Sequence, residues 1–416
     1  MEVAYSEALR NVTGDPSPHR TICPPNRLET RTWDLLAALP GLGNADSLSA
    51  LADSLRRFTG REHIFFAPSC RAAIAHILSL LPQKEVVMPV FTCPVVGAAV
   101  KIAGKSAIYV DSAPQQLNST SAQFVEHARR GRILLPTHLF GIPTDIENIC
   151  ELARNQGCIT IEDAAAALGT RHNGRPLGTF ADFGVFSFER SKRFPAFRGA
   201  AIVVNNDKIL EPSAFSHGPW ISEKHGPPSR DLAFALAYNI ATIPWLYGRL
   251  VLPRLLRRYA SWCRGSDAHA VDDPLNSPFY TQNFHPFQAA LVLRMLNRSD
   301  RIRDQIRHLV SAYVETLRNT SVATFLPNNY DGAGLLRFPI AVPRLNRPRL
   351  LQLTLERGIF LETNYEDLLA EWATDKDFPN ASWISRNMVL LPLYTALSVR
   401  NARALAEEVV AIAEQS

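Results

Sequence analysis

The sequence predicts an α/β protein, with a mostly parallel β-sheet domain covered by helices and a smaller C-terminal α+β domain. Short apolar runs alternate with helical segments through the first half of the chain, which is typical of strand–helix–strand units in a parallel sheet. In the last third, longer helices surround a few apolar strands. The length of 416 residues leaves room for two or three domains.

Six apolar runs are predicted to be buried strands of the first domain. They cover residues 85–90, 106–111, 132–137, 158–163, 182–188 and 200–206. Helical segments lie between several of these strands, among them residues 70–81 and 144–157. Together with a polar N-terminal segment of helical character, they define a predicted large domain over residues 1–210.

Residues 211–280 interrupt this alternation and are predicted to form a helical insertion. The stretch from Leu232 to Gly248 has no charged residue, and four arginines follow it. Its 17 residues are at the short limit for a membrane span, and Pro244 interrupts it. We expect a buried or interface helix pair, and a helix lying on a membrane surface is the alternative interpretation.

The remaining residues, 281–416, are predicted to form the smaller domain. A long helical pattern begins near Phe287. The strands expected after it are residues 334–342 and 387–394, and the expected helices are residues 347–358 and 398–415.

The composition excludes several classes of protein. Hydrophobic residues make up 46% and charged residues 20% of the chain, which argues against disorder and collagen-like repeats. The net charge of +5 is a mild excess and gives no reason to expect a nucleic acid partner. The six cysteines have neither zinc-site nor disulfide-framework spacing, and the N-terminal residues lack the apolar segment of a signal peptide. We therefore expect a reduced, cytoplasmic protein without a metal site.

Two residues at predicted strand ends are candidates for chemistry. The strand CITIED ends in Glu162 and Asp163, and ligands of open α/β sheets bind beyond the C-terminal ends of the strands. Lys192 follows the next strand, 29 residues further on, and is one of only seven lysines. An amine opposite a buried carboxylate is the pair that pyridoxal phosphate requires. The alternative is a helix-capping Asp163 and a solvated loop lysine.

A phosphate group needs hydrogen-bond donors, and the start of a helix supplies them. Ser69, Cys70 and Arg71 open the predicted helix over residues 70–81. The first-turn N–H groups, the Ser69 hydroxyl and the Arg71 cation are therefore candidates for binding a phosphate. An ordinary serine N-cap is the structural alternative.

An ordered series of motifs extends across these candidates. The motifs are SCRAAI (69–74), MPVFTCP (88–94), PTHLFGIPTDI (136–146), IEDAAAALG (161–169) and SFERSK (187–192). The series resembles the DegT/DnrJ/EryC1/StrS family of pyridoxal-phosphate aminotransferases, over roughly residues 50–210 and 281–416. The resemblance implies the fold type I architecture, with a mostly parallel seven-stranded sheet, and a homodimer with shared active sites.

The resemblance also implies a role for each candidate residue. Lys192 is expected to form the Schiff base with the cofactor and to move protons, and Asp163 to pair with the pyridine nitrogen. Ser187, Cys70 and Arg71 lie where the family binds the phosphate, partly through backbone N–H groups. Cys93 lies where the family stacks an aromatic residue on the ring. His138 falls near the cofactor side of the sheet, where a structural role is the alternative.

The implied reaction moves an amino group from an amino acid such as glutamate to a carbonyl acceptor. In this family the acceptor is often a nucleotide-linked keto sugar. The chain departs from the family pattern at Cys93, at Ala166 (usually Gln) and at Leu168 (often His). The family's N-x-R segment, which the partner subunit contributes, aligns with residues 281–283. The expected Asn is missing or displaced there, with Asn283 as the candidate substitute.

Two other interpretations remain open. One is a pyridoxal-phosphate enzyme with a different reaction, such as elimination or dehydration, although the family's dehydratases typically replace the lysine by histidine. The other is a non-catalytic binding protein with the same fold. A nicotinamide enzyme is excluded, because Gly41–Leu42–Gly43 follows no strand and lacks the third glycine of the dinucleotide-binding motif.

Overall fold

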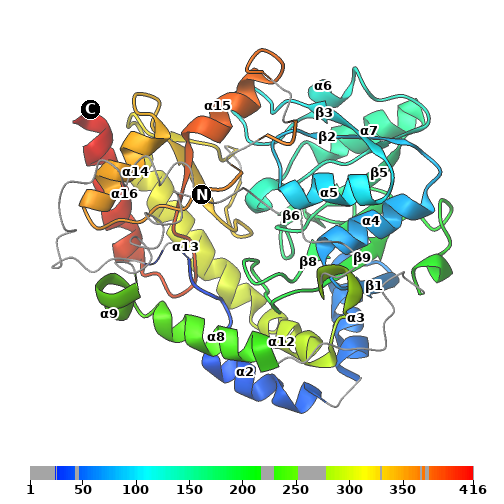
Figure 1. Ribbon diagram of the computed structural model, residues 1–416, viewed down its shortest axis with the longest axis horizontal. Helices are drawn as coiled ribbons and strands as arrows, with labels where there is room; N and C mark the ends of the chain where they lie inside the picture. Colours follow the sequence, from blue (N-terminus) through cyan, green and yellow to red (C-terminus); the bar gives the residue numbers. More distant parts are fainter. Residues whose placement is uncertain are drawn as a thin grey trace, which may run out of the picture.

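The computed structural model describes residues 24, 26–42, 46–216, 229–251, 278–327, 330–365, 368–370 and 374–415. A seven-stranded sheet dominates the N-terminal half (Figure 1), in the order β1-β9-β8-β5-β4-β2-β3. Its strands are β1 (His63–Ala67), β2 (Glu85–Pro89), β3 (Ser106–Val110), β4 (Arg132–Leu134), β5 (Ile159–Asp163), β8 (Phe183–Ser187) and β9 (Ala200–Val204).

The direction of the strands confirms the mostly parallel sheet. The five neighbours from β3 to β8 run parallel, whereas β9 is antiparallel to both β8 and β1. All six predicted strands are present. The edge strand β1 is not among the predicted ones, because its sequence HIFFA is only partly buried and does not alternate strictly.

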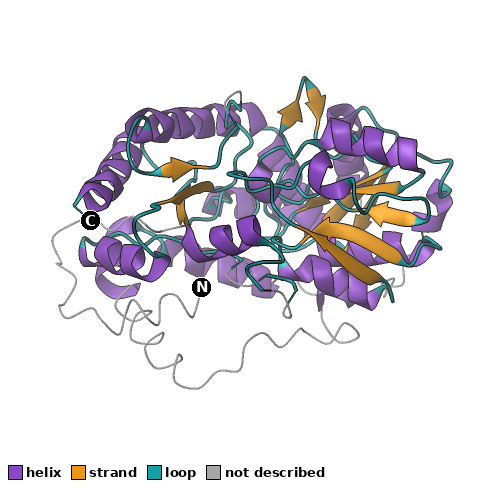
Figure 2. Ribbon diagram, turned by 90° about the horizontal axis from the view of Figure 1, so that it is seen from above, coloured by secondary structure: helices purple, strands orange, loops and turns teal. Residues whose placement is uncertain are grey.

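Helices lie on both faces of this sheet (Figure 2). They include α3 (Asp46–Thr59), α4 (Cys70–Leu80), α5 (Pro94–Ile102), α6 (Ser121–Phe124) and α7 (Ile146–Gln156). The helices predicted over residues 70–81 and 144–157 are thus present as α4 and α7. Seven residues of α4 are buried, which explains why its sequence is apolar on nearly every side.

The C-terminal part contains a second, antiparallel sheet. Its strands are β10 (Ala323–Thr324), β11 (Phe338–Ala341) and β12 (Met388–Leu391). The helices of this part are α12 (Pro286–Leu296), α13 (Ser299–Leu317), α14 (Arg347–Glu356), α15 (Pro379–Asn387) and α16 (Val399–Glu414). Both predicted strands and both predicted later helices are found here. Two-residue β10 is too short to give a sequence pattern.

The long helical pattern that begins near Phe287 is two helices. Helix α12 ends before Asn297 and α13 starts after Arg298, whose φ of −112° is not helical. The guanidinium of Arg298 donates a 2.7 Å hydrogen bond to Asp34, whose side chain is only 5% exposed. A periodicity continues across this break, and therefore the sequence pattern alone does not reveal it.

Part of the predicted insertion lies outside the described residues, including the arginines after residue 251. The described part contains α8 (Ser229–Ala241), α9 (Pro244–Leu246), a π-helical turn over residues 247–251 and α11 (Pro278–Thr281). Helix α8 lies beside α2 (Thr32–Ala38). The uncharged stretch is broken just before Pro244. Over the described residues, none of the helices combines the length and the apolar character that crossing a membrane requires.

The carboxylate of Glu162 fixes the C-terminal end of β5, which borders the candidate active site. Glu162 is completely buried, and it accepts hydrogen bonds from the backbone N–H groups of Gly178, Phe180 and Ala181 in the turn before β8. The Nε2 atom of His138 lies 2.9 Å from the same carboxylate. Because a buried charge is tolerated only when donors surround it, this carboxylate ties the turn to β5.

Replacing Glu162 with alanine should lower the free energy of unfolding by about 3–5 kcal/mol, because three N–H groups and His138 lose their buried acceptor. Glu162→Gln should lose less, since an amide still offers one acceptor oxygen. Urea titration measures both values, and Glu126→Gln at an exposed position is the matched control. Equal unfolding midpoints for Glu162→Ala and the control would contradict this role.

Candidate active site

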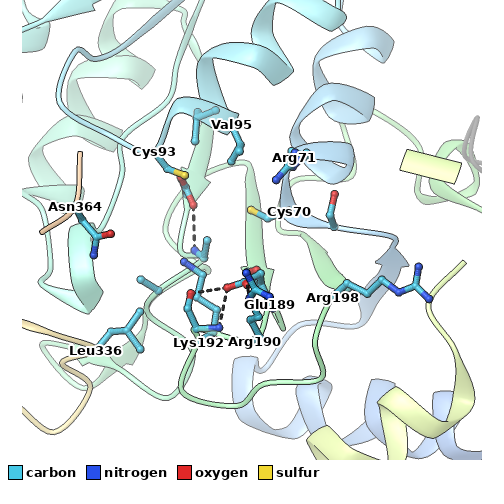
Figure 3. Close-up of a pocket in the computed structure, with 18 of the residues that line it drawn as sticks. Cys70, Arg71, Cys93, Val95, Glu189, Arg190, Lys192, Arg198, Leu336 and Asn364 are labelled. Atoms are coloured by element: carbon cyan, nitrogen blue, oxygen red, sulfur yellow. Dashed lines mark hydrogen bonds and ion pairs between the residues drawn. The ribbon is translucent and has the colours of Figure 1, made fainter. Parts of the chain in front are cut away.

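A cavity of about 900 Å³ opens at the C-terminal ends of β5 and β8. All seven residues predicted for the site line it, and Figure 3 shows four of them, Cys70, Arg71, Cys93 and Lys192, around the same space. The other three are Ser69, Asp163 and Ser187. The structure therefore brings together residues that span more than 120 positions of the sequence.

Pairing of β5 with β8 explains how the two strand-end candidates meet. The strands are parallel, with Asp163 opposite Val185, so both carboxyl ends reach the same edge of the sheet. The Oδ1 atom of Asp163 accepts a 3.0 Å hydrogen bond from the Ala165 N–H. Burial raises the pKa of the Asp163 carboxyl, and this N–H and the nearby Lys192 partly oppose the shift. A cation placed against Asp163 would favour its ionised form.

Lys192 lies in the connection between β8 and β9, and its backbone is fixed by its neighbours. Its N–H donates a 2.9 Å hydrogen bond to the Glu189 carbonyl. The next residue, Arg193, is buried and forms an ion pair with the buried Glu29. The carboxylate of Glu29 also accepts hydrogen bonds from the backbone and hydroxyl of Thr395. Two distant parts of the chain, around Glu29 and Thr395, thus hold the lysine loop.

The opening turn of α4 supplies the predicted phosphate-binding groups. Ser69 is the N-cap, and its Oγ accepts a 3.2 Å hydrogen bond from the Ala72 N–H. The capping role that was the structural alternative is therefore observed. Ser187 also lines the cavity, at the end of β8, and its Oγ accepts a hydrogen bond from the Glu189 N–H at 3.3 Å.

Two thiols line the cavity and both stay neutral at ordinary pH. Burial raises the pKa of Cys70 well above its usual range, and burial likewise raises the pKa of Cys93. Cys93 is the N-cap of α5 and makes no capping hydrogen bond through its side chain. A neutral, compact side chain therefore occupies the position where the resemblance leads one to expect an aromatic ring.

Two stacked aromatic residues line the cavity, and the sequence analysis does not predict this pair. The rings of Phe140 and Tyr365 are stacked, with centroids 5.6 Å apart, and Phe91 packs edge-on against Tyr365. Both stacked residues have positive φ, 54° and 56°, a region that bulky residues rarely adopt. Their sequence separation of more than 200 residues leaves no local signal that would reveal the pair.

The C-terminal part contributes a charged pair to the same cavity. The Nε atom of Arg337 donates a 2.7 Å hydrogen bond to Glu362, and both residues line the cavity. Gln282, within the segment aligned with the family's N-x-R element, also lines it and accepts a hydrogen bond from Arg198. Arg337 and Glu362 belong to no recognised motif, which is why sequence reasoning misses them.

His138 is not among the described residues that line the cavity. Its Nδ1 accepts a 3.0 Å hydrogen bond from the Thr144 N–H, so its Nε2 carries the proton that faces Glu162. The side chain is completely buried. This arrangement favours the structural alternative for His138: it holds β5 and the preceding loop together.

Two known aminotransferases are similar to this chain in sequence. A UDP-N-acetyl-3-dehydro-alpha-D-glucosamine 3-aminotransferase of Acidithiobacillus ferrooxidans is 35% identical over 153 residues, covering 36% of this chain and 41% of that protein. A dTDP-3-amino-3,4,6-trideoxy-alpha-D-glucose transaminase of Streptomyces venezuelae is 28% identical over 328 residues, covering 72% and 79%. The chain thus spans less than half of the first relative and most of the second.

The fold type I architecture is confirmed by the solved structures. A Streptococcus pneumoniae protein in its PMP form has a TM-score of 0.71 at 18% identity, over 95% of this chain and 99% of that one. The model of the DegT/DnrJ/EryC1/StrS aminotransferase family matches residues 41–231 and 270–410. The chain is therefore a member of the DegT/DnrJ/EryC1/StrS aminotransferase family.

Proposed function

We propose that the protein is a pyridoxal-phosphate-dependent aminotransferase that moves an amino group from glutamate to a nucleotide-linked keto sugar. The observation that carries this proposal is the placement of Lys192 and Asp163 on one cavity, at the ends of two paired parallel strands. The family membership supports the reaction type. The two curated relatives described above, which carry the names of sugar-nucleotide aminotransferases, support the acceptor class.

The donor set of the cavity fits pyridoxal phosphate. Asp163 is a nearly buried carboxylate whose pKa is raised, and the protonated pyridine nitrogen of the cofactor would supply the missing cation. At the opposite end, the Ser69 hydroxyl, the Arg71 guanidinium and the first N–H groups of α4 would hold the phosphate. When bound, the cofactor supplies an electron sink for the carbanion that transamination requires.

The residues of the chain then have separate tasks. Lys192 anchors the cofactor and carries the proton to and from the reacting carbon of the substrate, a task that suits an amine with a movable chain. Asp163 keeps the ring nitrogen protonated through both halves of the reaction. Cys93 and Ala166 are small and line the cavity. They would therefore leave more space beside the pyridine ring of the cofactor than larger residues at these positions.

We further propose that the protein is a cytoplasmic homodimer with active sites shared between subunits, as the resemblance implies. The four cysteines in the described part of the chain are free thiols, which suits a reducing compartment. Sedimentation or size-exclusion measurements with light scattering would identify the dimer.

The reaction is tested by adding glutamate alone to the cofactor-loaded protein. We expect one equivalent of 2-oxoglutarate per active site and conversion of the cofactor to its amine form, because the donor half-reaction needs no acceptor. Aspartate and alanine are the comparison donors. If no amino acid of a broad panel gives a keto acid while the cofactor is bound, the aminotransferase function is wrong and elimination or another carbanion reaction replaces it.

Borohydride reduction of the loaded protein should attach the pyridoxyl group to Lys192 alone, because this lysine shares the cavity with Asp163. Peptide mapping by mass spectrometry locates the label. Lys192→Arg should abolish the label, and Lys101→Arg, an exposed change on α5, should leave it in place. A label on another lysine of the wild-type protein would overturn the assignment.

Asp163→Asn should lower turnover at least about 100-fold, because a neutral amide no longer favours the protonated ring during carbanion formation. The cofactor-free variant should unfold at higher urea concentration than wild type at pH 7. Burial raises the Asp163 pKa, so the folded wild-type protein holds this proton more tightly than the unfolded chain does. The stabilisation of the wild type by this proton is complete below the unfolded pKa and is lost as the pH rises through the folded pKa. The neutral asparagine amide has no such loss at pH 7.

The stability difference between Asp163→Asn and wild type should therefore shrink as the pH falls toward the ordinary pKa of aspartate. Urea titrations of both cofactor-free proteins at several pH values measure it. Full turnover of Asp163→Asn would show that Asp163 is only a turn residue. A stability difference that grows on acidification would show that folding does not raise the Asp163 pKa.

A further inference from the structure

One cavity-lining residue comes from the insertion. The family model leaves residues 232–269 unmatched. Phe234 lies in this stretch, on α8, and lines the cavity. Of the described residues that line the cavity, Phe234 is the only one outside the two matched stretches. A segment outside the stretches matched by the family model therefore borders a site whose other described lining residues lie within those stretches.

Phe234 contacts one of the cations of the site. The guanidinium carbon of Arg190 lies 5.2 Å from the centre of the Phe234 ring, which is the arrangement of a cation–π interaction. The Nε atom of Arg190 also lies 3.4 Å from Glu189. Two neighbours thus confine a side chain that remains 59% exposed. Figure 3 shows Arg190 and Glu189 beside Lys192.

Helix α8 is held firmly enough to position Arg190. Ala235 is completely buried, the Tyr238 hydroxyl donates to the Asn26 carbonyl, and the Asn239 amide donates to the Thr30 carbonyl. The segment between these two carbonyls contains Glu29, the ion-pair partner of Arg193. The helix that carries Phe234 and the loop that carries Arg190 are therefore anchored to the same short segment.

Arg190 is a charged residue of the cavity to which no role in cofactor binding has been assigned. Five basic and three acidic side chains line the cavity. Lys192 and Arg71 are assigned to the cofactor, and Arg337 is paired with Glu362. Arg198 is hydrogen-bonded to Gln282. Arg190 combines high exposure with a position on the cavity wall, and a guanidinium is suited to bind phosphate oxygens in pairs.

We propose that Arg190 binds the diphosphate of the nucleotide-linked acceptor and that Phe234 is the positioning residue that holds its guanidinium, an inference that rests on the function proposed above. The ligand class is a nucleoside diphosphate. The insertion then contributes to acceptor binding through a single aromatic contact, while the chemistry of Lys192 and Asp163 stays with the family's segments.

Isothermal titration of the cofactor-loaded protein with UDP, dTDP and GDP tests the proposal. At least one nucleotide should bind to the wild type. Arg190→Ala should weaken that binding about ten-fold or more, and Arg190→Gln should do the same, because both remove a charge-assisted contact. The affinity of both variants should also depend less on salt concentration.

The positioning role is tested with paired variants at residue 234. Phe234→Leu should weaken nucleotide binding about two- to five-fold, whereas Phe234→Tyr keeps an aromatic face and should bind like the wild type. In the Arg190→Ala background, Phe234→Leu should have no further effect. Ile240→Ala is the matched control, because Ile240 is 58% exposed on the same helix and does not line the cavity.

Each outcome decides one part of the proposal. Unchanged affinity in Arg190→Ala and Arg190→Gln overturns the phosphate contact. Equal affinities for Phe234→Leu and Phe234→Tyr, or an undiminished effect of Phe234→Leu without Arg190, overturn the positioning role. If none of the three nucleotides binds to a wild-type preparation that releases 2-oxoglutarate from glutamate, the nucleotide assignment fails while the aminotransferase function stands.

Discussion

The buried carboxylate of Glu162 is the constraint on which the geometry of the active-site edge depends. It collects three backbone N–H groups from the turn before β8 and the Nε2 proton of His138. Successive side chains of a strand point to opposite faces, so with Glu162 committed to this network Asp163 is directed to the cavity. The same turn sets where β8 begins and hence where Ser187 and the Lys192 loop follow.

A second buried ion pair connects the lysine loop to the rest of the molecule. Arg193 follows Lys192 directly and pairs with Glu29 from the N-terminal segment, and Glu29 also binds Thr395 from the C-terminal part. Arg193 additionally donates to the carbonyl of Leu335, close to the cavity residue Arg337. Leaving either charge unpaired in the interior would cost free energy. This ion pair therefore fixes the lysine loop relative to the N-terminal and C-terminal segments that it contacts.

The residues that line the cavity come from different parts of the chain. The residues proposed for cofactor chemistry come from strand ends and a helix start of the seven-stranded sheet. The pair Arg337–Glu362 and the stacked Tyr365 come from the C-terminal part, and Phe234 comes from the insertion. Loops and insertions vary more readily than packed strands. The cavity thus combines residues of the seven-stranded sheet with residues from other parts of the chain.

The sequence by itself was sufficient to predict the strands β2, β3, β4, β5, β8 and β9, helices α4 and α7, and seven of the residues that line the cavity. Each of these has a local signal: an apolar run, a capping serine, a strand-end carboxylate or a motif of fixed spacing. The edge strand β1, the break between α12 and α13, and the contact of Phe234 with Arg190 have none. They depend on which segments pack together across long sequence separations, and only the tertiary structure decides this, because burial and pairing are properties of the assembled chain.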